Sequence, residues 1–257
     1  MDVTSPVYIV IGATGGIGSA LTRKLAARGA NLVLGARDSE KLHALALETQ
    51  THHQPQYVSM PQYASMDATR FEDVDALVAQ AISSFGRLDG LVNCVGSILL
   101  KPAHLTSIND YRETIALNLD SAFFAIKSAS KAMYKSGGSI VLCSSAVART
   151  GLVNHEAIAA AKAGVSGLTL SAAATYAQRN IRVNCVAPGL VDTPMSARIT
   201  SNEASRVHSE GMHALGRLGQ PHDVAEAIDW LLDSTRSGWV TGQTIGVDGG
   251  LGTIRPR

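Results

Sequence analysis

Two short stretches of the sequence carry the side chains best suited to chemistry. Ser144 and Ser145 end an apolar run, and His155, Glu156 and Lys162 follow within a stretch rich in alanine. Hydroxyl, imidazole, carboxylate and ammonium groups can polarise a carbonyl or move a proton. The stretch reads as a strand end, a loop and the start of a helix. We expect the rest of the chain to bring a nucleotide and a substrate to the lysine.

The elements that must position these groups alternate between strand and helix. The expected strands are apolar runs without polar alternation, which is typical of strands buried on both faces of a parallel sheet. We therefore predict one α/β domain over residues 1–257, a doubly wound parallel sheet with helices on both faces, and a substrate lid at about 195–220. Expected strands lie at 7–11, 31–34, near 63, 88–95, 139–143, 181–187 and 243–247, and expected helices at 17–28, around 42–45, 71–85, 106–134 (two), 156–177 and 222–232.

Composition excludes several classes of function. A formal charge of +1 gives no electrostatic reason to expect binding to nucleic acid or an anionic membrane. We find no apolar run of membrane-spanning length, no signal-peptide pattern and no metal-ligand cluster. The three cysteines, Cys94, Cys143 and Cys185, form no CxxC pair and lie in or beside expected strands, so we predict inert thiols in a reducing, cytoplasmic compartment.

A glycine-rich turn follows the first expected strand. Gly12, Gly16 and Gly18 enclose Thr14 and Ile17 and open the first helix. Glycines let a phosphate approach the backbone, and a helix N-terminus offers unpaired N–H groups and the positive end of its dipole. The spacing differs from G-x-G-x-x-G, but its place between strand and helix predicts a dinucleotide site.

The tip of the second strand bears on the choice of nucleotide. An acid there would bind the ribose hydroxyls of NAD, whereas an arginine can pair with the 2′-phosphate of NADP. Ala36 occupies the position expected for the acid and Arg37 follows it, while Asp38 reads as the start of the next helix. The sequence favours NADP(H) over NAD(H).

From Val7 to about Gly252 the chain resembles the short-chain dehydrogenase/reductase family, with a Rossmann-type sheet of seven strands. The motifs are Gly12–Gly18 (with Ile11 in place of the usual threonine), Met66-Asp67-Ala68, Asn93-Cys94-Val95-Gly96, Leu117-Asn118-Leu119, Pro188-Gly189-Leu-Val-Asp-Thr193 and Val247-Asp248-Gly249-Gly250. Together with Arg37, the resemblance implies cofactor contacts from Gly12, Thr14, Gly16, Ile17, Gly18, Asp67, Ala68, Asn93, Gly96, Lys162, Pro188, Gly189, Val191 and Thr193.

The resemblance also implies an active site that has lost its acid. Family members use a tyrosine as the acid, a lysine four residues later and a serine 13 residues earlier. Lys162 matches the lysine, Ser145 the serine and Asn118 the family's helix asparagine, but the tyrosine position is Ile158. Isoleucine cannot transfer a proton, and losing a general acid costs about 10²–10⁴ in rate.

Three readings of this site stay open. The protein could reduce a carbonyl or activated double bond with another donor, and His155 stands seven residues before Lys162, like the wider spacing in the enoyl reductase branch. The proton could instead come through water held by Asn118 and Lys162. The alternative is an inactive or weak NADP(H)-binding protein acting as sensor, scaffold or oligomer partner. Equally, Asn154 could cap the helix, leaving His155 merely facing solvent.

Self-association is the last expectation. The alanine-rich helix at 157–177 contains Gly164 and Gly167, and small residues allow close approach of another helix. In the family this helix packs against its counterpart in another subunit, so we expect a homotetramer, with a homodimer as the alternative. Packing against its own sheet would also explain the small residues.

Overall fold

The computed structural model describes residues 5–51 and 61–254. It contains one sheet of seven strands in the order β3-β2-β1-β4-β5-β6-β7, and every neighbouring pair is parallel. The strands are β1 Val7–Ile11, β2 Asn31–Ala36, β3 Gln62–Ser65, β4 Gly90–Asn93, β5 Gly138–Cys143, β6 Ile181–Pro188 and β7 Thr244–Val247. The prediction of a doubly wound parallel sheet is confirmed.

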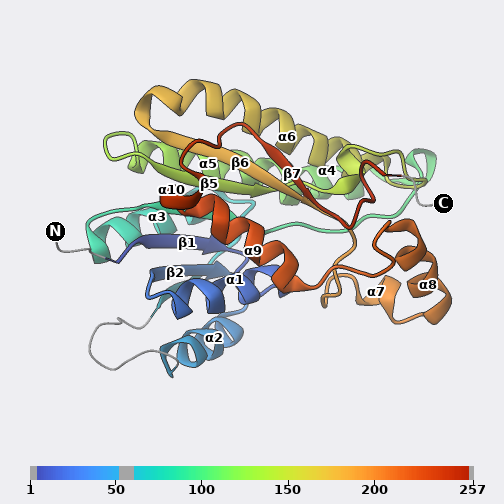
Figure 1. Ribbon diagram of the computed structural model, residues 1–257, viewed down its shortest axis with the longest axis horizontal. Helices are drawn as coiled ribbons and strands as arrows, with labels where there is room; N and C mark the ends of the chain where they lie inside the picture. Colours follow the sequence, from blue (N-terminus) through green and yellow to red (C-terminus); the bar gives the residue numbers. More distant parts are fainter. Residues whose placement is uncertain (1–4, 52–60, 255–257) are drawn as a thin grey trace.

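Helices cover both faces of the sheet (Figure 1). One apolar cluster packs α1, α2 and α9 against one face, and a second packs α3, α5 and α6 against the other. The helices are α1 Gly16–Ala27, α2 Ser39–Thr51, α3 Phe71–Phe85, α4 Ile108–Ile115, α5 Ser121–Ala132, α6 Glu156–Tyr176, α7 Ala197–Thr200, α8 Glu203–Met212, α9 Pro221–Leu232 and α10 Ser234–Ser237.

The strand order reverses between β1 and β4, so the loops after these two strands diverge to opposite faces of the sheet. In open parallel sheets, the crevice at such a switch point is where ligands bind. Here it lies beyond Ile11 and Asn93, which are paired at the carboxyl ends of their strands. The glycine turn therefore opens at the place where a doubly wound sheet binds its ligand.

One turn of π-helix, Ala116–Asp120, joins α4 to α5. The predicted pair of helices is thus a nearly continuous rod with a bulge at its middle. A π-bulge widens the helix by one residue and frequently lies at a functional site. The bulge contains Asn118, which is 1% exposed.

Helix α6 begins at Glu156, one residue later than a cap at Asn154 would place it. Asn154 has a left-handed backbone (φ 64°) and lies before the helix, while His155 occupies the N-cap position and makes no capping bond through its side chain. Asparagine tolerates left-handed backbone better than most residues. The expectation that Asn154 caps this helix is therefore wrong.

The same helix qualifies the expectation about membrane spans. With its 3₁₀ extension, Glu156–Arg179 is long and apolar enough to cross a membrane by length and composition, and 44% of its most apolar window is buried. Val165 and Ala172 belong to a core cluster that also includes β6 residues. This is the packing of a helix against its own sheet.

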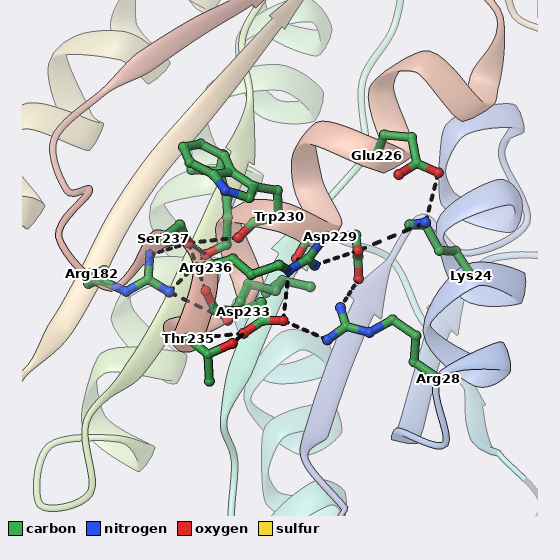
Figure 2. A network of polar contacts seen from close by, with 12 residues as sticks. Lys24, Arg28, Arg182, Glu226, Asp229, Trp230, Asp233, Thr235, Arg236 and Ser237 are labelled. Carbon is green, nitrogen blue, oxygen red and sulfur yellow. Dashed lines mark hydrogen bonds and ion pairs between the residues drawn. The ribbon is translucent and has the colours of Figure 1, made fainter.

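A network of charged side chains ties α1 to α9 and α10 (Figure 2). Asp229, 1% exposed, receives Arg28 from α1 and Arg236 from α10. Asp233 accepts hydrogen bonds from the same two arginines, at 2.7 and 2.8 Å. Because α1 begins at the glycine turn, this network fixes the helix on which that turn rests.

Candidate functional site

The glycine turn has the backbone that a phosphate cradle requires. Gly12 has φ +81°, and a Cβ on Gly18 would overlap the carbonyl oxygen of Gly12. The N-cap of α1 is Gly15, and no side chain caps this end of the helix. The first N–H groups of α1, around Gly16 and Ile17, therefore point toward the crevice without a side-chain partner, which suits an anion.

Thr193, predicted to contact the nicotinamide end of a cofactor, lies directly across this turn. A Cβ on Gly16 would come within 2.5 Å of the Thr193 Cγ2 atom. Thr193 follows β6, and its backbone N–H donates to Ser196 Oγ at 3.0 Å. Pro188, Gly189 and Val191 precede it on the same segment. The structure thus brings the glycine turn and the segment after β6 together.

The tips of β2 and β3 place a cation and an anion near each other. Arg37 is exposed immediately after β2, and it helps to lower the pKa of Asp67. Hydrogen bonds from the Thr69 backbone and hydroxyl, the latter at 2.8 Å, are the main cause of that lowering. Asp38 accepts a bond from the Lys41 N–H at 3.0 Å, confirming that it begins α2.

The Asn-x-x-Gly motif after β4 is held from inside the protein. Asn93, 3% exposed, donates to Ser121 Oγ at 3.1 Å and accepts from the Val95 N–H at 3.0 Å. Its side chain thus shapes the loop that presents Gly96 rather than facing the crevice. Ala68, beside Asp67, is likewise buried at 5% exposure.

Gly96, Asn118 and Lys162 meet at the centre of the site. A Cβ on Gly96 would lie 2.9 Å from Asn118 Oδ1 and 3.2 Å from Lys162 Nζ. Asn118 also bonds Ser97, accepting from its N–H at 3.1 Å and donating to its Oγ at 2.9 Å. Three segments that are distant in sequence therefore converge as the motifs predicted.

Lys162 is a buried ammonium held by backbone. It is 7% exposed, and Nζ donates to the carbonyl oxygen of Cys143 at 2.8 Å. Burial lowers its pKa, because the charged form loses hydration. Ser144 Oγ donates to the Lys162 carbonyl at 2.7 Å, which fixes α6 to the end of β5.

Ser145 follows Ser144, which bonds the Lys162 carbonyl, and the Ser145 hydroxyl makes only long contacts. Its Oγ is 3.5 Å from the Pro188 carbonyl and 3.4 Å from the Val147 N–H. Both contacts are long for hydrogen bonds of their kind. A half-buried hydroxyl with weak partners can turn to donate to a bound carbonyl.

The position of the missing acid is filled by buried hydrocarbon. Ile158 is 5% exposed and belongs to neither of the core clusters formed by the described residues. His155, the proposed substitute, is half-buried, and its Nδ1 lies 2.7 Å from the Val153 carbonyl oxygen. With Nδ1–H donating to that carbonyl, only Nε2 remains for a substrate.

The lid region predicted at 195–220 contains two short helices, α7 and α8, which project beyond one end of the sheet (Figure 1). Arg206 of α8 pairs with Asp192 at 3.2 Å. His213, 2% exposed, accepts from the Leu190 N–H and lies 2.6 Å from the Ser209 carbonyl. The Arg206–Asp192 pair and the Leu190–His213 bond join the lid to the segment after β6.

Sequence reasoning missed two thiols at this edge of the sheet. Asn93 and Leu142 form the last pair between β4 and β5, so Cys94 and Cys143 are the next residues along these two adjacent parallel strands. They are 49 positions apart in the sequence (143 − 94). Only the strand order could have revealed their proximity.

These residues fit a nicotinamide dinucleotide. The glycine turn offers a cradle that a Cβ would fill, Thr193 lies against that turn, and Arg37 places an exposed cation at the tip of β2. Among residues 5–51 and 61–254, no group of three or more His, Cys, Asp or Glu side chains is arranged to hold a metal ion.

Comparisons with known proteins place the chain in a family. A family model described as Enoyl-(Acyl carrier protein) reductase matches residues 12–252. Cis-4-hydroxycyclohexanecarboxylate dehydrogenase of Sinomonas cyclohexanicum is 38% identical, over 96% of this chain and 97% of its own length. The 2,5-dichloro-2,5-cyclohexadiene-1,4-diol dehydrogenase of Sphingobium indicum is 35% identical, over 98% and 99%.

Solved structures agree. An actinorhodin polyketide ketoreductase with NADPH superposes with a TM-score of 0.89 at 29% identity, covering 97% of this chain and 98% of that one. Fold, motifs and relatives together define a class of oxidoreductases. The chain belongs to the short-chain dehydrogenase/reductase family.

Proposed function

We propose that this protein is an NADP(H)-dependent oxidoreductase that reduces a carbonyl or an activated double bond of a small molecule. The observation that carries the proposal is the buried Lys162 ammonium, which meets Asn118 and Gly96 beside the glycine turn. A buried cation at the switch point of a doubly wound sheet needs a ligand to justify its desolvation. The NADPH in the ketoreductase structure supports the same choice of cofactor.

Each side chain has a role in this proposal. The glycine turn and the start of α1 hold the pyrophosphate, and Arg37 binds the 2′-phosphate. Lys162 and Thr193 orient the nicotinamide half, which supplies a hydride when the cofactor is bound. Ser145 donates to the substrate oxygen, where its weakly held hydroxyl can follow the developing charge.

The active site is non-standard because Ile158 cannot supply the proton. Asn118 and Lys162 can hold a water in the position of a relay, and His155 retains Nε2 at the rim. An activated double bond needs a weaker acid than a ketone does. We therefore expect the preferred substrate to be one whose reduction does not need a strong general acid.

The second candidate is a catalytically weak or inactive NADP(H)-binding protein that serves as sensor, scaffold or oligomer partner. Buried hydrocarbon at Ile158, beside an otherwise complete cofactor frame, favours it. The two candidates share the cofactor and differ in turnover.

One experiment separates them. NADPH is titrated by its fluorescence, and hydride transfer is then assayed against carbonyl and enoyl substrates in the wild type and in Lys162→Met. Activity that falls by about 10²-fold or more in Lys162→Met supports the oxidoreductase. Binding without turnover supports the second candidate, and no NADPH binding refutes both.

We also propose that the protein acts as a homotetramer, with a homodimer as the alternative, in the cytoplasm. A Cβ on Gly164 would meet Leu119 of the same chain at 3.0 Å, so this glycine serves internal packing. Gly167 has open space around it, and Leu170, one turn on, is 60% exposed. Leu170→Glu should lower the mass measured by light scattering, whereas Leu47→Glu on α2 is the matched control.

A further inference from the structure

The two thiols beside the site form a pair that the proposed reduction does not use. Cys94 and Cys143 leave the carboxyl ends of adjacent parallel strands one step beyond the last pair, Asn93 and Leu142. Adjacent strands are about 4.7–4.9 Å apart, which lies within the Cα separations that a disulfide bridges, about 4.4–6.8 Å. Both side chains pack against the same apolar cluster, so they point to the same face of the sheet.

Exposure also distinguishes the pair from the third cysteine. Cys94 and Cys143 are both partly exposed, whereas Cys185 on β6 is buried. The Cys94 backbone packs against the glycine turn: a Cβ on Gly12 would come within 3.1 Å of it.

The surroundings favour one thiol as a nucleophile. Hydrogen bonding with the neighbouring Cys94 thiol lowers the pKa of Cys143. The charge of Lys162 adds to the lowering. The same bond and burial raise the pKa of Cys94. Reactive cysteines occur in such partly exposed, electropositive surroundings, because the thiolate is the nucleophile.

From this geometry we propose that Cys94 and Cys143 are a redox-active pair that closes to a disulfide on exposure to a hydroperoxide and thereby weakens the nucleotide site. The Cys143 thiolate attacks the peroxide, forming S–O and breaking O–O, and an alcohol or water leaves. The Cys94 thiol then attacks that sulfur, forming S–S as the sulfenic oxygen leaves as water. Two thiols are oxidised and one hydroperoxide is reduced.

Closure would act on both halves of the cofactor site. The Cys143 carbonyl holds Lys162 Nζ at 2.8 Å, and the Cys94 N–H donates to the Ile11 carbonyl at 2.9 Å, next to Gly12. Forming the S–S bond turns both cysteine side chains toward each other and strains the peptides that carry them, which shifts the lysine anchor and the support of the glycine turn. This consequence rests on the proposed function, whereas formation of the disulfide does not.

The full chain is treated with hydrogen peroxide. Disulfides are then located by peptide mapping in the absence of reductant, and NADPH binding is measured by titration. We expect the peptides containing Cys94 and Cys143 to become linked, NADPH binding to be lost and dithiothreitol to restore both. Cys94→Ser and Cys143→Ser should abolish the link, and Cys185→Ser should leave it. Cys94→Ala and Cys143→Ala, checked by thermal melting, guard against a folding defect.

The outcomes are distinct. Absence of the link in wild type, or oxidation confined to one cysteine, overturns the redox pair. A link that leaves NADPH affinity unchanged overturns its action on the site. Failure of the reduced protein to bind NADPH at all refutes the proposed function, while the peptide map still decides whether the pair forms.

Discussion

At the scale of single residues, Ile158 decides the chemistry. A tyrosine there would place a phenol four residues before Lys162, on the same side of α6. We predict that Ile158→Tyr raises carbonyl reduction by about 10²–10⁴-fold, measured as NADPH oxidation with a ketone panel. Ile158→Phe is the matched control, because it adds the ring without the hydroxyl. Equal gains in both variants would show that shape, not acidity, limits the reaction.

Arg37 decides between the two nucleotides. Its guanidinium is exposed at the tip of β2. NADP differs from NAD only by a charged 2′-phosphate, which we expect to lie at this tip. We predict that Arg37→Ala weakens NADPH binding by about tenfold, the effect of one charge-assisted hydrogen bond, and leaves NADH binding almost unchanged. Parallel fluorescence titrations measure the ratio, and a uniform loss for both nucleotides would contradict this role.

The resemblance to the family indicated the lysine, the serine and the glycine turn, because the chain keeps the family's motifs and the family's spacing between serine and lysine. That resemblance could not show that Asn93 is used internally, or that His155 is engaged at Nδ1. Those facts depend on which side chains the tertiary fold brings within bonding distance. The sequence spacing of Cys94 and Cys143 likewise hid a contact that the β4–β5 pairing creates.

At the scale of elements, the sequence predicted strands and helices well because buried strands are apolar runs and α3 has a clear apolar face. Boundaries were less certain: the fourth strand, expected at 88–95, spans only Gly90–Asn93. The π-bulge at Asn118 had no sequence signature. The bulge packs against α6, a tertiary contact that local propensity does not reveal.

The two helices that flank the site use glycine for different reasons. A Cβ on Gly18 would overlap Gly12, whereas one on Gly167 meets open space. We predict that Gly18→Ala destabilises the fold by about 1–3 kcal/mol and abolishes NADPH binding. Gly167→Ala should instead stabilise an isolated chain by about 0.5–1 kcal/mol. Urea unfolding measures both, and equal effects would refute the distinction.

At the scale of the whole molecule, two carboxylates should set the response to acid: Asp233, in the network that joins α1 to α9 and α10 (Figure 2), and Asp223, in the first turn of α9. Burial acts to raise the pKa of Asp233, but hydrogen bonds from Thr235, Arg236 and Arg28 outweigh it and hold the pKa below its ordinary value. Arg217 is the main cause of a pKa of about 2 at Asp223, which begins α9. Both carboxylates are thus stabilised as anions in the folded state.

A lowered folded-state pKa means that the unfolded chain binds the proton first as the pH falls. The stabilisation from both carboxylates is present above the unfolded aspartate pKa of about 4 and is lost as the pH falls toward about 2. We predict that the thermal midpoint decreases as the pH is lowered from about 5 to about 2, the window between the unfolded and folded aspartate pKa values. Asp223→Asn should flatten this decline. Asp38→Asn is the comparison variant: hydrogen bonds from Lys41 also lower the pKa of Asp38, but this exposed carboxylate stabilises only the start of α2, so its loss should flatten the decline less than Asp223→Asn does. An unchanged slope in Asp223→Asn would place the acid sensitivity elsewhere in the molecule.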